Sequence, residues 1–261
     1  MNNSFKLLTR ILCLVVACGT AQAGLWDQLK SAFTTSNDAA TAVSALPQAE
    51  IAGGLKAALG QGVSNAVVSL GHAGGFLTNL NVRIPMPEQL QTVEKGLRLA
   101  GQNQLVDDFV GSLNHAAEQA VPVAAGVFGD AIQQMSIADA RGILAGPDDA
   151  ATQYFKRTAE TNLFAKFYPI VQKATDSVGL TARYKGLMGK FSGLDALGGL
   201  GGLLGPKQPA TLEAGDLDRY VTDKALDGLF KMVAEEEKRI RANPAARTSD
   251  LLQKVFSSAR Q

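Results

Sequence analysis

The chain has 261 residues, of which 46% are hydrophobic and 19% charged, a balance typical of one globular domain, or at most two, and not of a disordered chain. Its formal net charge is +1, from 25 basic and 24 acidic residues. Nucleic-acid-binding proteins usually carry a basic excess or stripe. The composition therefore argues against a nucleic-acid partner.

The first 23 residues have the three-part layout of a secretory signal peptide. Met1–Arg10 is polar and basic, and Ile11–Cys18 is apolar but shorter than the roughly 20 residues that span a bilayer. The segment then ends in Ala21–Ala23, an Ala-x-Ala cleavage pattern. We expect cleavage after Ala23 and export to the periplasm or another part of the cell envelope.

A second processing route stays open. Val15–Cys18 resembles a loose lipobox, in which Cys18 would be lipidated and would anchor the protein to a membrane. We favour simple cleavage because the small residues before Gly24 have the better spacing. Removal of the signal peptide takes away Lys6 and Arg10 and leaves 23 basic and 24 acidic residues, a net charge of about −1.

Helical periodicity dominates the rest of the chain. Residues 24–47 contain a short helical segment and a linker rich in Ser, Thr and Ala, and residues 48–257 form the domain. Asn81–Pro85 is the single candidate for a short extended segment. Helices are predicted near residues 48–70, 87–100, 104–120, 122–135, 136–146, 149–178, 216–242 and 248–256. The sequence therefore predicts one all-α domain of about eight irregularly packed helices.

Several local signals refine this pattern. Ser136 and Asp139 have the spacing of a capping box, and Asp148 can cap the helix that follows it. Gly186–Gly205 contains eight glycines with interleaved leucines, and we expect a loop over residues 191–215 that interrupts the domain. It is interpreted as a surface insertion, with contact to a membrane surface or a partner as the alternative, since exposed leucine is costly. No later stretch is long and apolar enough to predict a transmembrane helix.

The sequence lacks the common catalytic and cofactor motifs. Both cysteines lie in the signal segment, so the mature chain has no disulfide and no thiol nucleophile. Its two histidines, His72 and His115, form no His-Glu-x-x-His pattern, and we expect no metal site. There is also no Gly-x-Ser-x-Gly elbow, Walker A loop or dinucleotide fingerprint. No cofactor is therefore expected.

The most informative polar residues lie on the last long helix. Its apolar stripe contains Leu226, Leu229, Phe230, Val233 and Ile240. At about 100° per residue, Glu237 and Arg241 fall on the same stripe, whereas Glu235 and Arg239 form a solvated pair on the opposite side. We favour a buried ion pair that fixes packing, because an unsatisfied buried charge is expensive. One alternative is a ligand-binding or catalytic role, and the other is a frayed helix end at which both groups are solvated.

Two further pairs are candidates. Asn114 flanks the apolar face of its helix with Glu118 one turn later, which indicates a polar contact between helices or, alternatively, one wall of a pocket. Tyr154 and Thr158 share a face of the helix over residues 149–178, together with Thr161. Threonines on such a face are expected to donate to a carbonyl one turn earlier.

The same residues contribute to a family resemblance. The motifs are Asn114-x-Ala-Ala-Glu118, Ala150-Ala-Thr-x-Tyr-Phe155, Tyr168-Pro169, Ala225-Leu-Asp-Gly-Leu-Phe230, Glu236-Glu237-x-x-Ile240-Arg241-x-Asn243-Pro244 and Arg247. With these motifs the chain resembles the bacterial "domain of unknown function 4197" family over most of residues 45–257. The resemblance implies an exported helical protein without an assigned activity, and it transfers no catalytic residues.

The leading hypothesis is a non-enzymatic envelope protein that binds a partner protein or an apolar ligand between its helices. The alternative is a metal-independent hydrolase or lyase that uses Glu237 with Arg241, Asn114 or Glu118. A purely structural or assembly role is the third hypothesis. The candidate polar cluster contains Asn114, Glu118, Tyr154, Thr158, Glu237, Arg241 and Arg247.

Overall fold

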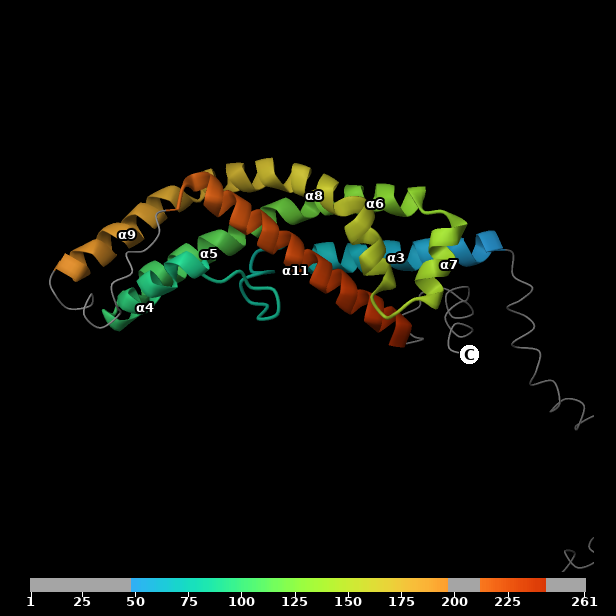
Figure 1. Ribbon diagram of the computed structural model, residues 1–261, viewed down its shortest axis with the longest axis horizontal. Coiled ribbons are helices and arrows are strands. Elements are labelled where there is room, and N and C mark those ends of the chain that lie inside the picture. Colours follow the sequence, from blue (N-terminus) through green and yellow to red (C-terminus); the bar gives the residue numbers. More distant parts are fainter. Residues whose placement is uncertain (1–47, 197–211, 243–261) are drawn as a thin grey trace, which may run out of the picture. The chain divides into compact units, whose positions relative to one another are not determined.

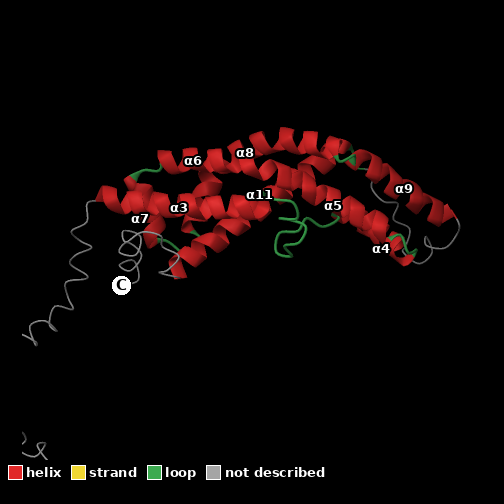
Figure 2. Cartoon of the chain, turned by 180° about the vertical axis from the view of Figure 1, so that it is seen from behind, coloured by secondary structure: helices red, strands yellow, loops and turns green. Residues whose placement is uncertain are grey.

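The computed structural model describes residues 48–196 and 212–242, which belong to one compact unit spanning residues 47–261. These ranges contain eight α-helices, two short 3₁₀ helices and no β-strand, which confirms the all-α class (Figures 1 and 2). The elements are α3 (Gln48–Leu70), η2 (Glu88–Leu90), α4 (Gln91–Leu99), α5 (Asn103–Ala120), η3 (Val121–Val123), α6 (Ala124–Gln134), α7 (Ile137–Ala145), α8 (Ala150–Ser177), α9 (Leu180–Ala196) and α11 (Ala214–Ala242). The signal segment with Cys18, Arg247 and the terminal helix predicted over 248–256 lie outside the described residues.

Helix α11 packs against three other helices. It packs along α8 and also against α3 and α5, and Figure 1 shows it running from the α8–α9 junction towards α7. The stripe predicted on this helix is buried throughout. An aromatic contact joins three helices at its middle, where the Phe128 ring meets Phe155 edge-on at 4.9 Å and Phe230 at 5.9 Å between centroids. Such pairs add to the free energy gained by burying the rings.

The connection between α3 and η2 is irregular but partly buried. Residues 83–87 have no regular secondary structure, so the candidate extended segment at Asn81–Pro85 does not form a strand. Phe76 and Ile84 are nevertheless fully buried. Phe76 fits against α11 because residue 228 is glycine and leaves space for its ring. The segment is thus part of the core.

The prediction for the glycine- and leucine-rich segment was partly wrong. Residues 186–196 belong to α9, and only residues 197–211 of the predicted loop lie outside the described residues. Leu180, Leu187 and Phe191 are buried at helical spacing, and α9 packs against α5, α4 and α8. Burial of these side chains offsets the helix-weakening effect of the glycines, about 1 kcal/mol each.

The capping box predicted from Ser136 and Asp139 is confirmed. The capping box of α7 is present, with the Asp139 N–H donating to Ser136 Oγ at 3.1 Å and the Ser136 N–H donating to Asp139 Oδ2 at 3.1 Å. Helix α8 continues through Pro169.

None of the helices in the described ranges is long and apolar enough to cross a bilayer.

Substitution of Gly228 by alanine tests the close packing of the irregular connection. A Cβ atom there would lie 2.7 Å from Phe76 Cε1 and 3.2 Å from Val82 Cβ. We expect Gly228→Ala to lower the free energy of unfolding by about 1–3 kcal/mol, measured by urea denaturation.

The matched control is Gly126→Ala in α6, where a Cβ would meet no atom within 4 Å. This variant should be as stable as the parent or up to about 1 kcal/mol more stable, because alanine has the higher helix propensity. Equal stability of the two variants would contradict the packing of Phe76 against Gly228.

Candidate functional site

Glu237 caps a helix other than its own. Its side chain is buried, with 5% of the residue exposed. Oε1 accepts the backbone N–H of Ala151 at 2.9 Å, and Oε2 accepts the backbone N–H and the hydroxyl of Thr152, both at 2.9 Å. Both residues lie in the first turn of α8, where N–H groups have no acceptor within the helix. The carboxylate from α11 supplies the missing acceptor.

This cap replaces the local one that the sequence predicts. Asp148 does not cap α8; the N-cap residue is Asp149, and its side chain makes no capping hydrogen bond. Asp149 Oδ2 instead accepts from the side chain of Gln153 at 3.0 Å. A buried carboxylate that accepts three hydrogen bonds and lies at the positive end of the helix dipole makes an exposed local cap unnecessary.

Arg241 extends the same arrangement to α7. Its Nε and Nη2 donate to Glu237 Oε1 at 3.1 and 2.8 Å, and Nη2 also donates to the carbonyl of Ile143 at 2.8 Å. Ile143 lies in the last turn of α7, where its carbonyl also accepts the backbone N–H of Gly146 at 3.3 Å. We call Glu237, Arg241 and the backbone of Ile143, Ala151 and Thr152 the helix clasp. It holds the end of α7 and the start of α8 against α11.

The helix clasp has little room for a substrate. Both oxygens of Glu237 already accept hydrogen bonds from Ala151, Thr152 and Arg241. The adjoining cavity measures about 10 Å³ and is lined mainly by apolar side chains of α3, α7 and α11. A general base needs a free lone pair within reach of the substrate proton. The geometry of Glu237 and Arg241 fits the buried, packing-fixing ion pair and gives no support to the catalytic alternative.

Asn114 and Glu118 fasten the irregular connection to α5. Asn114 is fully buried; its Oδ1 accepts the Ile84 N–H at 2.8 Å, and its Nδ2 donates to the Ile84 carbonyl at 2.9 Å. Glu118 Oε1 accepts the Phe76 N–H at 3.1 Å, and Oε2 lies 3.4 Å from His115 Nδ1. The partner is therefore the backbone of an irregular segment, neither a second helix nor a ligand pocket.

Tyr154 and Thr158 border a polar hollow. The Tyr154 hydroxyl donates to the Ala131 carbonyl at 3.0 Å, and Thr158 Oγ1 donates to the Tyr154 carbonyl at 2.8 Å, the predicted back-bond. Thr158 is exposed, and so is Thr161, because the buried face of α8 turns towards Phe155 instead. The hollow beside them, between α6, α7 and α8, has a volume of about 340 Å³.

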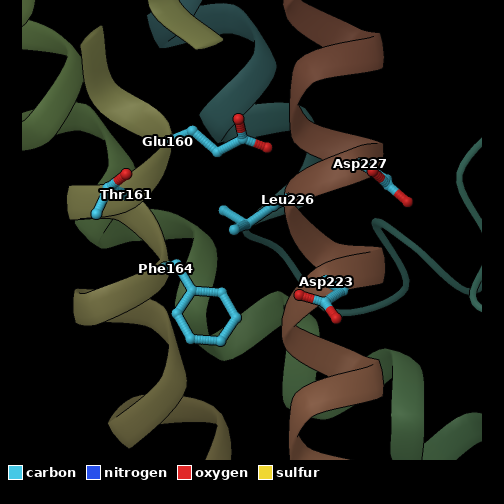
Figure 3. A pocket seen from close by; sticks show the side chains of 6 residues that line it. All are labelled: Glu160, Thr161, Phe164, Asp223, Leu226 and Asp227. Atoms are coloured by element: carbon cyan, nitrogen blue, oxygen red, sulfur yellow. The ribbon is translucent and has the colours of Figure 1, made fainter. Parts of the chain in front are cut away.

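A second hollow lies between α8 and α11, with a volume of about 420 Å³. We call it the acidic groove; it is lined by Glu160, Thr161 and Phe164 of α8 and by Asp223, Leu226 and Asp227 of α11. Figure 3 shows Glu160 and Leu226 extending into the space between the helices, whereas Asp227 projects from the side of α11 that faces away from α8. The sequence analysis missed this site because its residues come from two helices about 60 residues apart and match no motif.

The charges around the acidic groove are loosely paired. Asp223 lies 3.8 Å from Arg219 and Asp227 lies 3.6 Å from Lys224, and all four side chains are substantially exposed. Glu160 has no ion-pair partner within the described ranges. Across those ranges, no three His, Cys, Asp or Glu side chains are placed to hold a metal ion. The groove thus presents the three carboxylates of Glu160, Asp223 and Asp227 beside apolar side chains.

One surface pair differs from the prediction. Arg239 pairs with Glu236, three residues earlier, and not with Glu235. Glu236 Oε2 also accepts from Asn65 Nδ2 of α3 at 2.9 Å. Arg239 therefore pairs with the glutamate that also contacts α3, and Glu235 stays exposed.

The described candidate residues therefore fall into three separate places: the helix clasp, the fastening of the irregular connection and the wall of the polar hollow. Together with the fold, they define an all-α domain whose buried polar side chains hold backbone groups of neighbouring segments.

The family model described as "Protein of unknown function (DUF4197)" matches residues 45–257, and the chain belongs to this family. No curated protein and no solved structure matched the chain.

The helix clasp can be tested by Glu237→Gln. An amide in place of the carboxylate turns one acceptor into a donor and leaves a buried N–H or guanidinium group unpaired. We expect the free energy of unfolding to fall by about 3–5 kcal/mol in urea denaturation. The control is Glu235→Gln on the exposed side of α11, which should change stability by less than about 0.5 kcal/mol. Similar effects of both variants would show that the helix clasp does not stabilise the fold.

Proposed function

We propose that this protein is a non-enzymatic component of the cell envelope that binds a cationic segment of a partner protein in the acidic groove. The observation that supports this function is the 420 Å³ hollow between α8 and α11, in which carboxylates flank apolar side chains. Clefts between packed helices are common binding sites in helical proteins.

The chemistry of the acidic groove favours a lysine or arginine side chain of the partner. Leu226 and Phe164 offer apolar surface to an aliphatic stem, while Glu160 and Asp223 offer carboxylates to the charged head. The Phe164 ring is held by stacking on Tyr168 at 5.7 Å between centroids. A cation of the partner replaces the exposed pairing of Asp223 with Arg219 at little cost, because exposed ion pairs contribute about 0–1 kcal/mol.

We prefer binding to catalysis because the polar residues that the sequence suggests as catalytic already hydrogen-bond to backbone groups of the fold. Glu237 and Arg241 hydrogen-bond to the ends of α7 and α8, and Asn114 and Glu118 hold the irregular connection. The acidic groove, by contrast, holds exposed carboxylates with capacity for a new partner. An envelope location follows from the signal peptide proposed for residues 1–23.

The binding proposal is tested by fluorescence anisotropy with a labelled peptide of alternating lysine and leucine and, as its counterpart, one of alternating glutamate and leucine. The lysine peptide should bind the purified exported protein, and the double variant Glu160→Gln/Asp223→Asn should weaken binding about tenfold through the loss of two carboxylates. The control Asp176→Asn removes an exposed carboxylate of α8 outside the acidic groove. Equal binding of both peptides, or an equal loss in control and double variant, would refute the proposal.

The proposed export route is tested by intact-mass spectrometry of the protein recovered from the envelope of an expressing bacterium. We expect the mass of residues 24–261 without modification, because the cleavage pattern ends at Ala23. A mass that corresponds to residues 18–261 plus a diacylglyceryl group would assign lipidation to Cys18 instead. Full-length protein confined to the cytoplasm would contradict export.

A further inference from the structure

The polar hollow differs in character from the acidic groove. Its polar groups come from three helices, and both signs of charge are present. They are Asp130 and Gln134 of α6, Asp139 of α7, and Arg157, Thr158 and Asn162 of α8. The apolar part of the wall is small, and it consists of valine, alanine and the ring of Tyr154. A ligand that fits must itself be small and mostly polar.

The positive charge in the hollow lies over an aromatic ring. The Arg157 guanidinium lies over Tyr154, 5.6 Å from the ring centroid. The ring cannot move freely, because Tyr154 is 5% exposed and its hydroxyl donates to the Ala131 carbonyl at 3.0 Å. Burial raises the pKa of Tyr154, so the hydroxyl remains a neutral donor at physiological pH. The ring thereby restricts where the guanidinium can lie.

A negative charge is fixed independently on α7. Asp139 Oδ2 accepts the Ser136 hydroxyl at 2.6 Å and the Ser136 N–H at 3.1 Å within the capping box. These hydrogen bonds hold the pKa of Asp139 below its ordinary value, so the group is a carboxylate at any pH near neutral. Its other oxygen accepts no hydrogen bond from the described residues.

The opposite charges of the hollow do not pair with each other. Within the described ranges Arg157 forms no salt bridge, although Asp130 and Asp139 line the same 340 Å³ space. Opposite charges that face one space but stay apart leave room for a molecule that carries the complement of each.

We infer that the polar hollow binds a small zwitterion with one ammonium and one carboxylate group, the charge pattern of an amino acid or a short peptide. The ammonium group lies at Asp130 and Asp139, and the carboxylate lies at Arg157, with the amides of Gln134 and Asn162 available for further hydrogen bonds. The volume is at the small end of the range for ligand pockets. This site is separate from the acidic groove, and it does not depend on the function proposed there.

The test uses isothermal titration of the purified exported protein with glycylglycine and with 6-aminohexanoate, two zwitterions of different charge separation. The matched probes are N-acetylglycylglycine, which lacks the ammonium group, and glycylglycinamide, which lacks the carboxylate. At least one zwitterion should bind, and the singly charged analogues should bind about tenfold more weakly or not at all. Absence of binding by both zwitterions, or equal binding of the singly charged probes, would overturn the inference.

Two variants that each remove one charge of the polar hollow locate the binding. Arg157→Gln should weaken zwitterion binding about tenfold, and Asp130→Asn, an exposed position on α6, should do the same from the ammonium side. The control is Arg219→Gln, because Arg219 also lies over a ring, 5.7 Å from the centroid of Phe164, but borders the acidic groove. Unchanged binding by Arg157→Gln and Asp130→Asn with native melting temperatures, or an equal loss with Arg219→Gln, would exclude the polar hollow as the site.

Discussion

The carboxylate of Glu237 is the constraint on which the arrangement of this domain depends. It gives the first turn of α8 the acceptors that the helix itself lacks, and through Arg241 it engages the last turn of α7. A helix of 28 residues that is held at its first turn by a neighbour has a defined position and rotation relative to that neighbour. Because α8 forms one wall of both hollows, the helix clasp also determines where Arg157 and Glu160 can lie.

The other buried polar side chains follow the same principle. Asn114 and Glu118 supply hydrogen bonds to a segment without secondary structure, so Phe76 and Ile84 can enter the core without leaving their backbone groups unpaired. Within the described residues, no buried side-chain nitrogen or oxygen lacks a hydrogen-bond partner. The polar residues of the interior are therefore engaged in folding, which is why they are poor candidates for catalysis.

Charged groups with unused bonding capacity line the two hollows that α8 borders. One hollow is rich in carboxylates beside apolar surface, and the other has both signs of charge beside a fixed tyrosine ring. This difference in charge leads to two different expected occupants, a cationic segment and a small zwitterion. The polar pairs that the sequence singles out lie in the interior, whereas both hollows are lined by side chains that include exposed charges.

The amino-acid sequence by itself determined the class of this protein, because helical periodicity, the capping box at Ser136 and the buried stripe of α11 depend on neighbours within a few residues. It also placed Glu237 and Arg241 on the buried side of that stripe. Only the tertiary structure decided what these side chains bind, since the acceptor and donor groups of the helix clasp are 85 to 98 residues apart along the chain. The helicity of α9 was decided in the same way, because burial against other helices outweighs the local preference of its glycines. The acidic groove likewise exists only where two helices distant in sequence, α8 and α11, are packed side by side.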